Sequence, residues 1–308
     1  MSQLSGHVQD YLALRRALGF KLGKEGRLLP DFAAFAEAAG AATVTIDLAL
    51  AWAAGPESAS PVRAAQRLSM VRGLARYLQA VNPATQVPPA GLLPARTRRA
   101  TPYIYSDAEV AALMTAAGAL PGLLKAATFC TLIGLLATTG MRGSEAMALD
   151  RGDLDTAAGL LTIRATKFRK SRQLPLHNST LRALAAYQAT RDRLCPSPAT
   201  ASLLVSTTGA RLCHSTVQPV FRHLLRQAGI GHGTHRPRAT VHGLRHTFAV
   251  TTLLGWYRDG QEVQARLPAL STYLGHAGPA ATYWYLTGTP ELLALAAGRL
   301  EAAPGSSR

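Results

Sequence analysis

The chain has 308 residues, of which 33 are Lys or Arg and 17 are Asp or Glu, so its formal charge at pH 7 is +16. With 48% hydrophobic residues it has the composition of a globular protein, and its length fits two domains of about 150 residues each. Three cysteines without a close pair exclude a disulfide scaffold, and the N-terminus lacks a signal-peptide pattern. We therefore expect a protein of the reducing cytoplasm.

The charge is carried mainly by arginine, with 28 arginines against 5 lysines. Residues 1–100 have a formal charge of +6 and residues 101–308 of +10. A GC-rich genome would also favour arginine over lysine, but it would not explain the excess of basic over acidic residues. Both parts of the chain are therefore expected to contact a polyanion such as DNA.

Helical spacing of apolar residues predicts helices over residues 8–20, 28–39 and 61–80. The third begins at Ser60-Pro61, an N-cap followed by a proline at the first helical position. Its basic side chains form two i, i+4 pairs about half a turn apart, so one pair at a time can face DNA. We predict DNA contacts for Arg63 and Arg67.

Five prolines between residues 82 and 106 predict a linker. Its basic cluster either contacts DNA phosphates or is simply solvated: Arg96, Arg98 and Arg99. Beyond it, Ser106 followed by Glu109 predicts a capped helix start, and residues 121–139 predict a long core helix. Lys125 interrupts the most apolar stretch, which is too short for the ~20 residues that a bilayer requires. No membrane association is expected.

Residues 160–176 contain two β-prone runs around a cationic turn, which predicts one hairpin in an otherwise helical domain. Lys167 and Lys170 lie near its turn. An ammonium group there can give a proton to a leaving oxygen, which arginine cannot do at its pKa. A solvated hairpin is the alternative.

Three further segments place charged or titratable residues beside breaks in secondary structure. In ATTGMRGSEAMAL, Arg142 stands between two helices and Glu145 is close enough to orient it, although an Arg–Glu surface pair would look the same. In TVHGLRHTFAV, His242 and Arg245 share a helix face, whereas His246 is expected to point elsewhere and pack.

The last of these segments is STYLGHAGPAATYWYL. An unbroken helix would hold His276 and Tyr285 about 13.5 Å apart on opposite sides. Gly278-Pro279 is expected to break that helix, so that Tyr285 can fold back to the same cavity as His276.

Together these segments resemble the tyrosine recombinase, or phage integrase, family over about residues 101–300. The interval between Arg245 and His276 is longer than in many members. The resemblance implies that Tyr285 is the nucleophile and that Glu145 has a supporting role. The full catalytic set that it implies is Arg142, Lys167, His242, Arg245, His276 and Tyr285. It also implies a mainly α fold: an all-α core-binding domain (1–90), a linker (91–104), an α-rich catalytic domain with a small β-hairpin (105–303) and a disordered tail (304–308).

The function implied is that of a site-specific recombinase of a mobile element, which cuts and rejoins DNA through a 3′-phosphotyrosine. Arg142, Arg245 and His276 would stabilise the charged transition state, with His242 as the base and Lys167 as the acid. No cofactor or metal is expected. The partners implied are double-stranded DNA at specific sites and further copies in a homotetramer, with or without partner recombinases of the same element.

The segment after Tyr285 bears on that assembly, because it has an apolar stripe at helical spacing: Leu292, Leu293, Leu295, Ala296 and Leu300. The resemblance implies that it forms a helix that docks into a neighbouring protomer, and packing on its own domain is the alternative.

Three other functions are compatible with parts of the pattern. A type IB topoisomerase uses similar chemistry on one duplex, and a catalytically idle regulator could keep the same scaffold. A metalloenzyme is suggested by His232, His235, His242 and His246, but the sequence has no HExxH motif and no nearby Cys or Asp ligand.

Overall fold

The computed structural model divides into two compact units, Met1–Arg99 and Ala100–Arg308. It describes residues 3–55, 60–94, 101–164, 171–231, 237–276, 278, 280–286, 291–294 and 298. Within these ranges, no helix is both long and apolar enough to cross a membrane.

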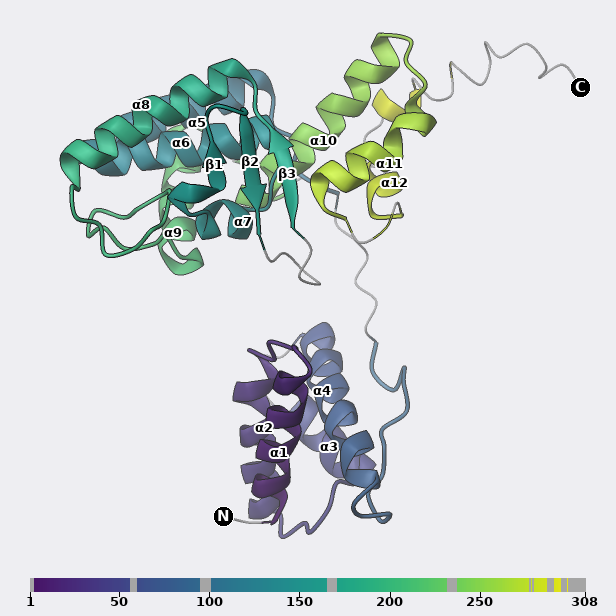
Figure 1. Cartoon of the computed structure of the whole chain (residues 1–308). Helices are drawn as coiled ribbons and strands as arrows, with labels where there is room; N and C mark the ends of the chain where they lie inside the picture. The colour runs from purple at the N-terminus through teal and green to yellow at the C-terminus, as the bar shows by residue number, and fades with distance from the viewer. Residues whose placement is uncertain are drawn as a thin grey trace, which may run out of the picture. The chain divides into compact units, whose positions relative to one another are not determined.

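The helices of the first unit pack against one another (Figure 1): α1 (Gln3–Ala17), α2 (Glu25–Ala38), α3 (Ile46–Ala54) and α4 (Pro61–Gln79). Three of them occupy the regions where apolar spacing predicts helices. Apolar spacing does not predict α3, because IDLALAWAA is apolar almost throughout and has no polar face that would reveal a helical period. Its local signal is Thr45, whose side chain accepts a hydrogen bond from the backbone N–H of Leu48.

The first half of the proline-rich segment packs on this unit. Arg72 donates from Nε to the carbonyl oxygen of Pro88 (2.7 Å) and from Nη2 to that of Pro89 (2.8 Å), and Leu93 packs against the core. Prolines keep their carbonyl acceptors although they lack an N–H. Residues 82–94 are therefore part of the helical unit rather than a free connection.

The C-terminal end of the predicted linker also packs on a folded unit. Tyr103 and Tyr105 are buried in the core of the second unit, and the Tyr105 hydroxyl donates to the carbonyl oxygen of Thr240 at 2.9 Å. The basic cluster of the linker lies outside the described residues: Arg96, Arg98 and Arg99.

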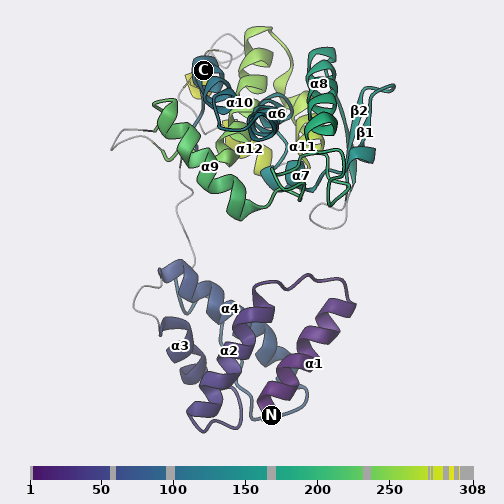
Figure 2. The same ribbon diagram turned by 90° about the vertical axis from the view of Figure 1, so that its left-hand side faces the viewer.

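The helices of the second unit are α5 (Asp107–Gly118), α6 (Leu123–Thr139), α7 (Gly143–Ala148), α8 (Asn178–Leu194), α9 (His214–Gln227), α10 (Val241–Arg258), α11 (Val263–Leu274) and α12 (Ala280–Leu286). The long helix α6 lies in the middle of the unit and contacts α5, α8 and α10 (Figure 2). The predicted capping box at the start of α5 is confirmed, since Ser106 and Glu109 bond to each other's backbone N–H.

A small antiparallel sheet follows the 3-10 turn η1 (Arg151–Asp153) and has the order β1 (Leu154–Asp155), β2 (Leu160–Ile163), β3 (Arg172–Pro175). The predicted hairpin, β2 and β3, is confirmed, and the short β1 is an addition to it. In the register, Leu161 stands opposite Leu174 and Ile163 opposite Arg172. Because strand side chains alternate, Arg172 shares a face with the buried Leu174.

A second, smaller core in this unit joins α10, α11 and α12 and includes Tyr285 and Leu292. Leu292 is fully buried there, whereas Leu293 is about half exposed. The described part of the C-terminal segment, residues 291–294, therefore packs on its own unit in this single chain.

Candidate active site

The first component of the candidate site is Arg142, at the junction of α6 and α7. Helix α6 ends at Gly140, which has a left-handed φ of 60°, and a Cβ there would lie 2.4 Å from Phe248. After this turn, Arg142 donates from its backbone N–H to Glu145 Oε2 (2.9 Å) and from Nη1 to Oε1 (2.8 Å). Glu145 thus orients Arg142, as the sequence predicts.

Arg172 is a second partner of Glu145, and the sequence motifs do not point to it. Its Nη1 and Nη2 donate to the two carboxylate oxygens at 3.1 and 2.8 Å, and both side chains are largely buried. Burial alone would raise the pKa of Glu145, but the hydrogen bonds from Arg172 and Arg142 outweigh it and lower that pKa. An arginine on the buried face of a strand is the signal that could have pointed to this residue.

Arg245 is the third arginine of the cluster and comes from α10. Its side chain is 2% exposed, and its Nη1 donates to the carbonyl oxygen of Gly140 at 2.9 Å. Desolvation by burial, together with the nearby positive charge of Arg142, lowers the pKa of Arg245 to about 10. It therefore stays charged at neutral pH.

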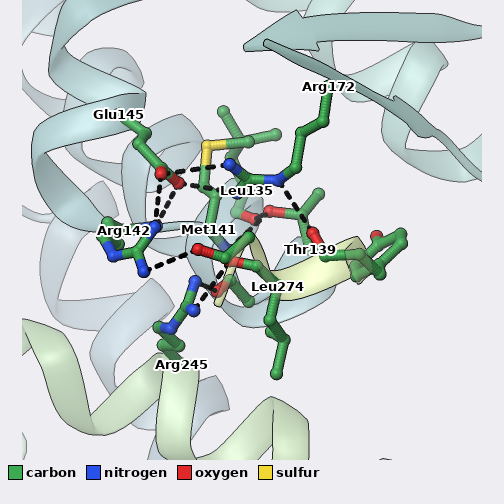
Figure 3. A network of polar contacts seen from close by, with 11 residues as sticks. Leu135, Thr139, Met141, Arg142, Glu145, Arg172, Arg245 and Leu274 are labelled. Atoms are coloured by element: carbon green, nitrogen blue, oxygen red, sulfur yellow. Dashed lines mark hydrogen bonds and ion pairs between the residues drawn. The ribbon is translucent and has the colours of Figure 1, made fainter. Parts of the chain in front are cut away.

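The three arginines meet at the C-terminus of α11 (Figure 3). Arg172 Nε donates to the carbonyl oxygen of Tyr273 (2.8 Å), Arg245 Nη2 to that of Leu274 (2.7 Å) and Arg142 Nη2 to that of Gly275 (2.9 Å). Three successive carbonyls thus each bind a different guanidinium.

The end of this helix explains why cations gather there. The last carbonyls of a helix have no partner within it, and they carry the negative end of the helix dipole. Gly275 adopts a left-handed φ of 69°, its N–H donates to Thr272 and the N–H of His276 donates to Ser271, which is a Schellman motif. The arginines bind the carbonyls that follow, so the turn that carries His276 is fixed in place.

His276 and Tyr285 lie on the two sides of this turn. The helix breaks at Gly275, before His276, and not at Gly278-Pro279 as the sequence suggested, since the left-handed Gly275 already ends α11. His276 Nδ1 is 2.7 Å from the hydroxyl oxygen of the buried Thr282 on α12. The rings of His276 and Tyr285 are nearly parallel, with centroids 6.1 Å apart, so the fold brings these residues together.

The two histidines of α10 differ from their predicted roles. His246 was expected to point away from the site, and this is wrong: its Nδ1 lies 3.2 Å from the hydroxyl oxygen of Tyr285. The return of α12 over α10 creates this contact, and helix periodicity alone cannot show it. His242, one turn earlier, is exposed and lines a cavity of about 230 Å³ together with Arg142.

The region that contains these residues matches the model of the phage integrase family over residues 105–291. The chain belongs to this family. Its members, the tyrosine recombinases, are enzymes that cleave and rejoin DNA strands.

Relatives support this membership over the whole chain. A putative integrase/recombinase, y4rB of Sinorhizobium fredii, is 45% identical over 98% of both chains. The tyrosine recombinase XerC of Azotobacter vinelandii is 33% identical over 72% of this chain and 68% of its own.

Solved structures show that the integrase fold extends over both units. The Tn1549 transposon integrase, in complex with transposon DNA, has a TM-score of 0.66 at 17% identity and covers 96% of this chain and 98% of its own. XerH recombinase bound to its difH substrate has a TM-score of 0.65 at 19% identity, over 89% and 78% of the two chains. The mainly α fold class predicted from the sequence is confirmed.

The remaining candidate residues of this integrase-family chain lie away from the turn or outside the described residues. Lys167 and Lys170 are outside them, as are two of the histidines behind the metal alternative, His232 and His235. Among the residues the structure does describe, no three His, Cys, Asp or Glu side chains form a group suited to a metal.

The two arginines of α4 differ in their surroundings. Arg63 is exposed, as a DNA contact requires. The guanidinium of Arg67 lies 4.0 Å above the ring of Trp52, and burial lowers its pKa. Arg67 therefore packs within its own unit, and its DNA contact stays a prediction.

Proposed function

We propose that this chain is a site-specific recombinase of a mobile element, which cuts and rejoins DNA through a 3′-phosphotyrosine formed on Tyr285. The observation that carries the proposal is the turn of residues 274–276. Arg142 and Arg245 bind its carbonyls, and the ring of Tyr285 lies against His276. The likeness to a transposon integrase supports the mobile-element context.

In this mechanism the arginines stabilise the charge that develops on the phosphate. Attack by Tyr285 gives a pentavalent phosphorus with one more negative charge than the diester. A guanidinium has five N–H donors, and the hydrogen bonds described above use two of those of Arg142 and two of those of Arg245. Each can therefore bind the turn and phosphate oxygens together, and losing one such donor typically costs about 3–4 kcal/mol of transition-state stabilisation. His276 is the third donor.

The reaction moves two protons. The bond between Tyr285 Oη and phosphorus forms while the bond from phosphorus to the 5′-oxygen breaks. The phenol has a reference pKa of about 10 and loses its proton to a base, for which the sequence suggests His242. Lys167 gives a proton to the departing 5′-oxygen. One phosphodiester replaces another, so rejoining to a second strand needs neither ATP nor a metal.

The partner of this reaction is double-stranded DNA at a specific site, which we propose is bound by both basic units in a homotetramer. Lys170 and the arginines of the linker would contribute contacts to the phosphates. Lambda integrase, which shares the fold with a TM-score of 0.60 at 18% identity, has been solved as a tetramer on a Holliday junction. This supports the assembly proposed for the present chain.

The test is to trap a covalent adduct on a nicked suicide substrate that carries the native element end. We expect the wild type to form the adduct and Tyr285→Phe to bind the same DNA without forming it. Tyr283→Phe is the matched control, because Tyr283 is about half exposed two residues away. Loss of the adduct in Tyr283→Phe, with Tyr285→Phe still reactive, would move the nucleophile to Tyr283.

A plasmid relaxation assay distinguishes recombination from topoisomerase-like activity. Recombination products should require two paired sites, whereas relaxation of a plasmid without any site would favour the topoisomerase alternative.

A further inference from the structure

We propose that His246, and not His242, takes the proton from Tyr285 when the tyrosine attacks DNA. The inference rests on the function proposed above and identifies a further catalytic residue within it. Its basis is the hydrogen-bond distance of 3.2 Å between His246 Nδ1 and Tyr285 Oη. A base must lie within such reach of the proton it removes.

The surroundings of His246 fix its ring in this position. Its centroid lies 4.5 Å from that of His242, edge to face, and 5.5 Å from those of Trp284 and Tyr285. The ring therefore stands between two aromatic neighbours from α12 and one from its own helix. Its rotamer is set by packing before DNA arrives.

Burial of the nucleophile makes a neighbouring base necessary. Tyr285 is 2% exposed, so its hydroxyl is shielded from bulk water. Its proton then leaves through a side chain that touches it. Imidazole has a reference pKa of about 6.5, so neutral His246 can accept a proton near pH 7.

The proton transfer balances as follows. His246 holds its own proton on Nε2 and leaves Nδ1 as the acceptor, because Nδ1 is the ring nitrogen that contacts the Tyr285 hydroxyl. The O–H bond of Tyr285 breaks, the N–H bond at Nδ1 forms, and the phenolate oxygen bonds to phosphorus. In rejoining, the 5′-hydroxyl gives its proton back to the Lys167 amine as its oxygen bonds to phosphorus, the bond from phosphorus to Tyr285 breaks, and Nδ1 returns the proton to the phenolic oxygen.

Arg245 supports the phenolate formed in this step. The negative charge of an ionised Tyr285 raises the pKa of Arg245. The same interaction stabilises the phenolate next to the guanidinium.

The two histidines then serve different parts of the reaction. They are separated by one helical turn, a rise of about 6 Å. His246 contacts the nucleophile, whereas His242 lines a cavity with Arg142 on the side where we place the phosphate. We assign His242 to the phosphate, while Lys167 stays the proposed acid for the leaving group.

The test uses two suicide substrates that differ in one atom. One carries the normal 5′-oxygen at the scissile phosphate and the other a 5′-bridging sulfur. A thiolate leaves without being protonated, because a thiol has a pKa of about 8.5. The sulfur substrate therefore rescues variants that lack the acid but not variants that lack the base. The readout is the single-turnover rate of adduct formation at saturating DNA.

We expect His246→Asn to slow adduct formation by roughly 10²–10⁴-fold on both substrates, the usual contribution of a general base. Asparagine places a polar atom where Nδ1 stands but cannot take up a proton at neutral pH. His246→Gln, which places that atom at Nε2 instead, should be equally slow. Lys167→Met is the matched control, because Lys167 is the proposed acid, and it should be slow on the oxygen substrate and recover on the sulfur substrate.

The outcomes separate this inference from the proposed function. A wild-type rate in His246→Asn, on either substrate, would overturn the assignment, because hydrogen bonding without proton transfer would then be sufficient. Rescue of His246→Gln by sulfur would also overturn it. Failure of the wild type to form an adduct on either substrate, or an adduct in Tyr285→Phe, would instead refute the proposed function. Thermal unfolding and DNA affinity close to wild type identify the variants that remain folded.

Discussion

Replacing Arg172 with methionine keeps an unbranched side chain but removes three hydrogen bonds. Two of them go to the carboxylate of Glu145 and one to the carbonyl oxygen of Tyr273. The variant leaves a largely buried carboxylate with Arg142 as its remaining described cation. We expect a marked loss of stability in the second unit.

The magnitude follows from the burial of the pair. Removing one partner of a buried ion pair typically costs 3–5 kcal/mol, because the other charge stays buried without compensation. Glu145 keeps two hydrogen bonds from Arg142, so we expect the lower end, about 3 kcal/mol. A unit of this size loses roughly 2–4 °C of melting temperature per kcal/mol, so its transition should fall by roughly 6–12 °C.

Calorimetry of the full chain at pH 7 measures this effect, with the second unit followed as its own transition if the two units unfold separately. Arg151→Met is the matched control: Arg151 donates to both carboxylate oxygens of Asp192, and the two side chains are 50% and 41% exposed. Its replacement should change the transition only slightly, as is usual for exposed ion pairs. A melting temperature of Arg172→Met within about 2 °C of the wild type, or equal to that of Arg151→Met, would refute the reasoning.

The pH dependence of this difference gives a second check. The pKa of Glu145 is lowered in the folded chain, so its ionised form contributes stability above its unfolded pKa of about 4.3. That contribution is lost as the pH falls through the lower folded pKa. The gap between wild type and Arg172→Met should therefore narrow below about pH 4, whereas a gap that is constant with pH would exclude an electrostatic origin.

Four further predictions follow from other parts of the chain. Gly275→Ala should destabilise the second unit, because its φ is 69° and a Cβ would lie 2.6 Å from an arginine nitrogen, while Gly278→Ala, with open space around it, should be neutral in the same melting experiment. Leu292→Ala should cost about 2–5 kcal/mol in chemical denaturation, and a similar loss in the half-exposed Leu293→Ala would contradict the described packing. Hydrogen bonds from neighbouring hydroxyl groups lower the pKa of the exposed Cys213 to about 7, so its alkylation by iodoacetamide should rise steeply between pH 6 and 8; a flat profile would refute this. For a protein that makes about 6–10 phosphate contacts, DNA affinity should fall by roughly 10³–10⁵ between 50 and 200 mM salt, and a flat titration would exclude binding by both basic units.

Local signals in the sequence predicted the elements that they specify. Ser60 and Ser106 cap the starts of α4 and α5, and Gly140 ends α6. Each of these signals acts within one turn of its own residue, so it can be recognised without knowledge of the fold. Helix α3 was not predicted, because its apolar residues show no helical period. The proline-rich segment has the composition of a linker, although its first half packs against Arg72.

The contacts that assemble the candidate site join residues that are far apart in the sequence. Arg172 reaches a carbonyl 101 positions away along the chain, and Arg245 reaches one 105 positions away. The position of His246 relative to Tyr285 depends on where α12 returns over α10. Identity and spacing could suggest these residues as candidates, but the direction of each side chain depends on tertiary packing.

The acceptors at the end of α11 have a consequence for how this region can vary. The three arginines bind main-chain oxygens there, and every amino acid supplies one. Drift in the side chains of Tyr273 and Leu274 would leave these acceptors in place, as long as the new residues still pack. Gly275 lacks this freedom, because the space beside it is filled by Arg172. One turn therefore contains two positions that tolerate substitution and one that does not. A library randomised over residues 273–275 should return varied residues at the first two positions and glycine at the third.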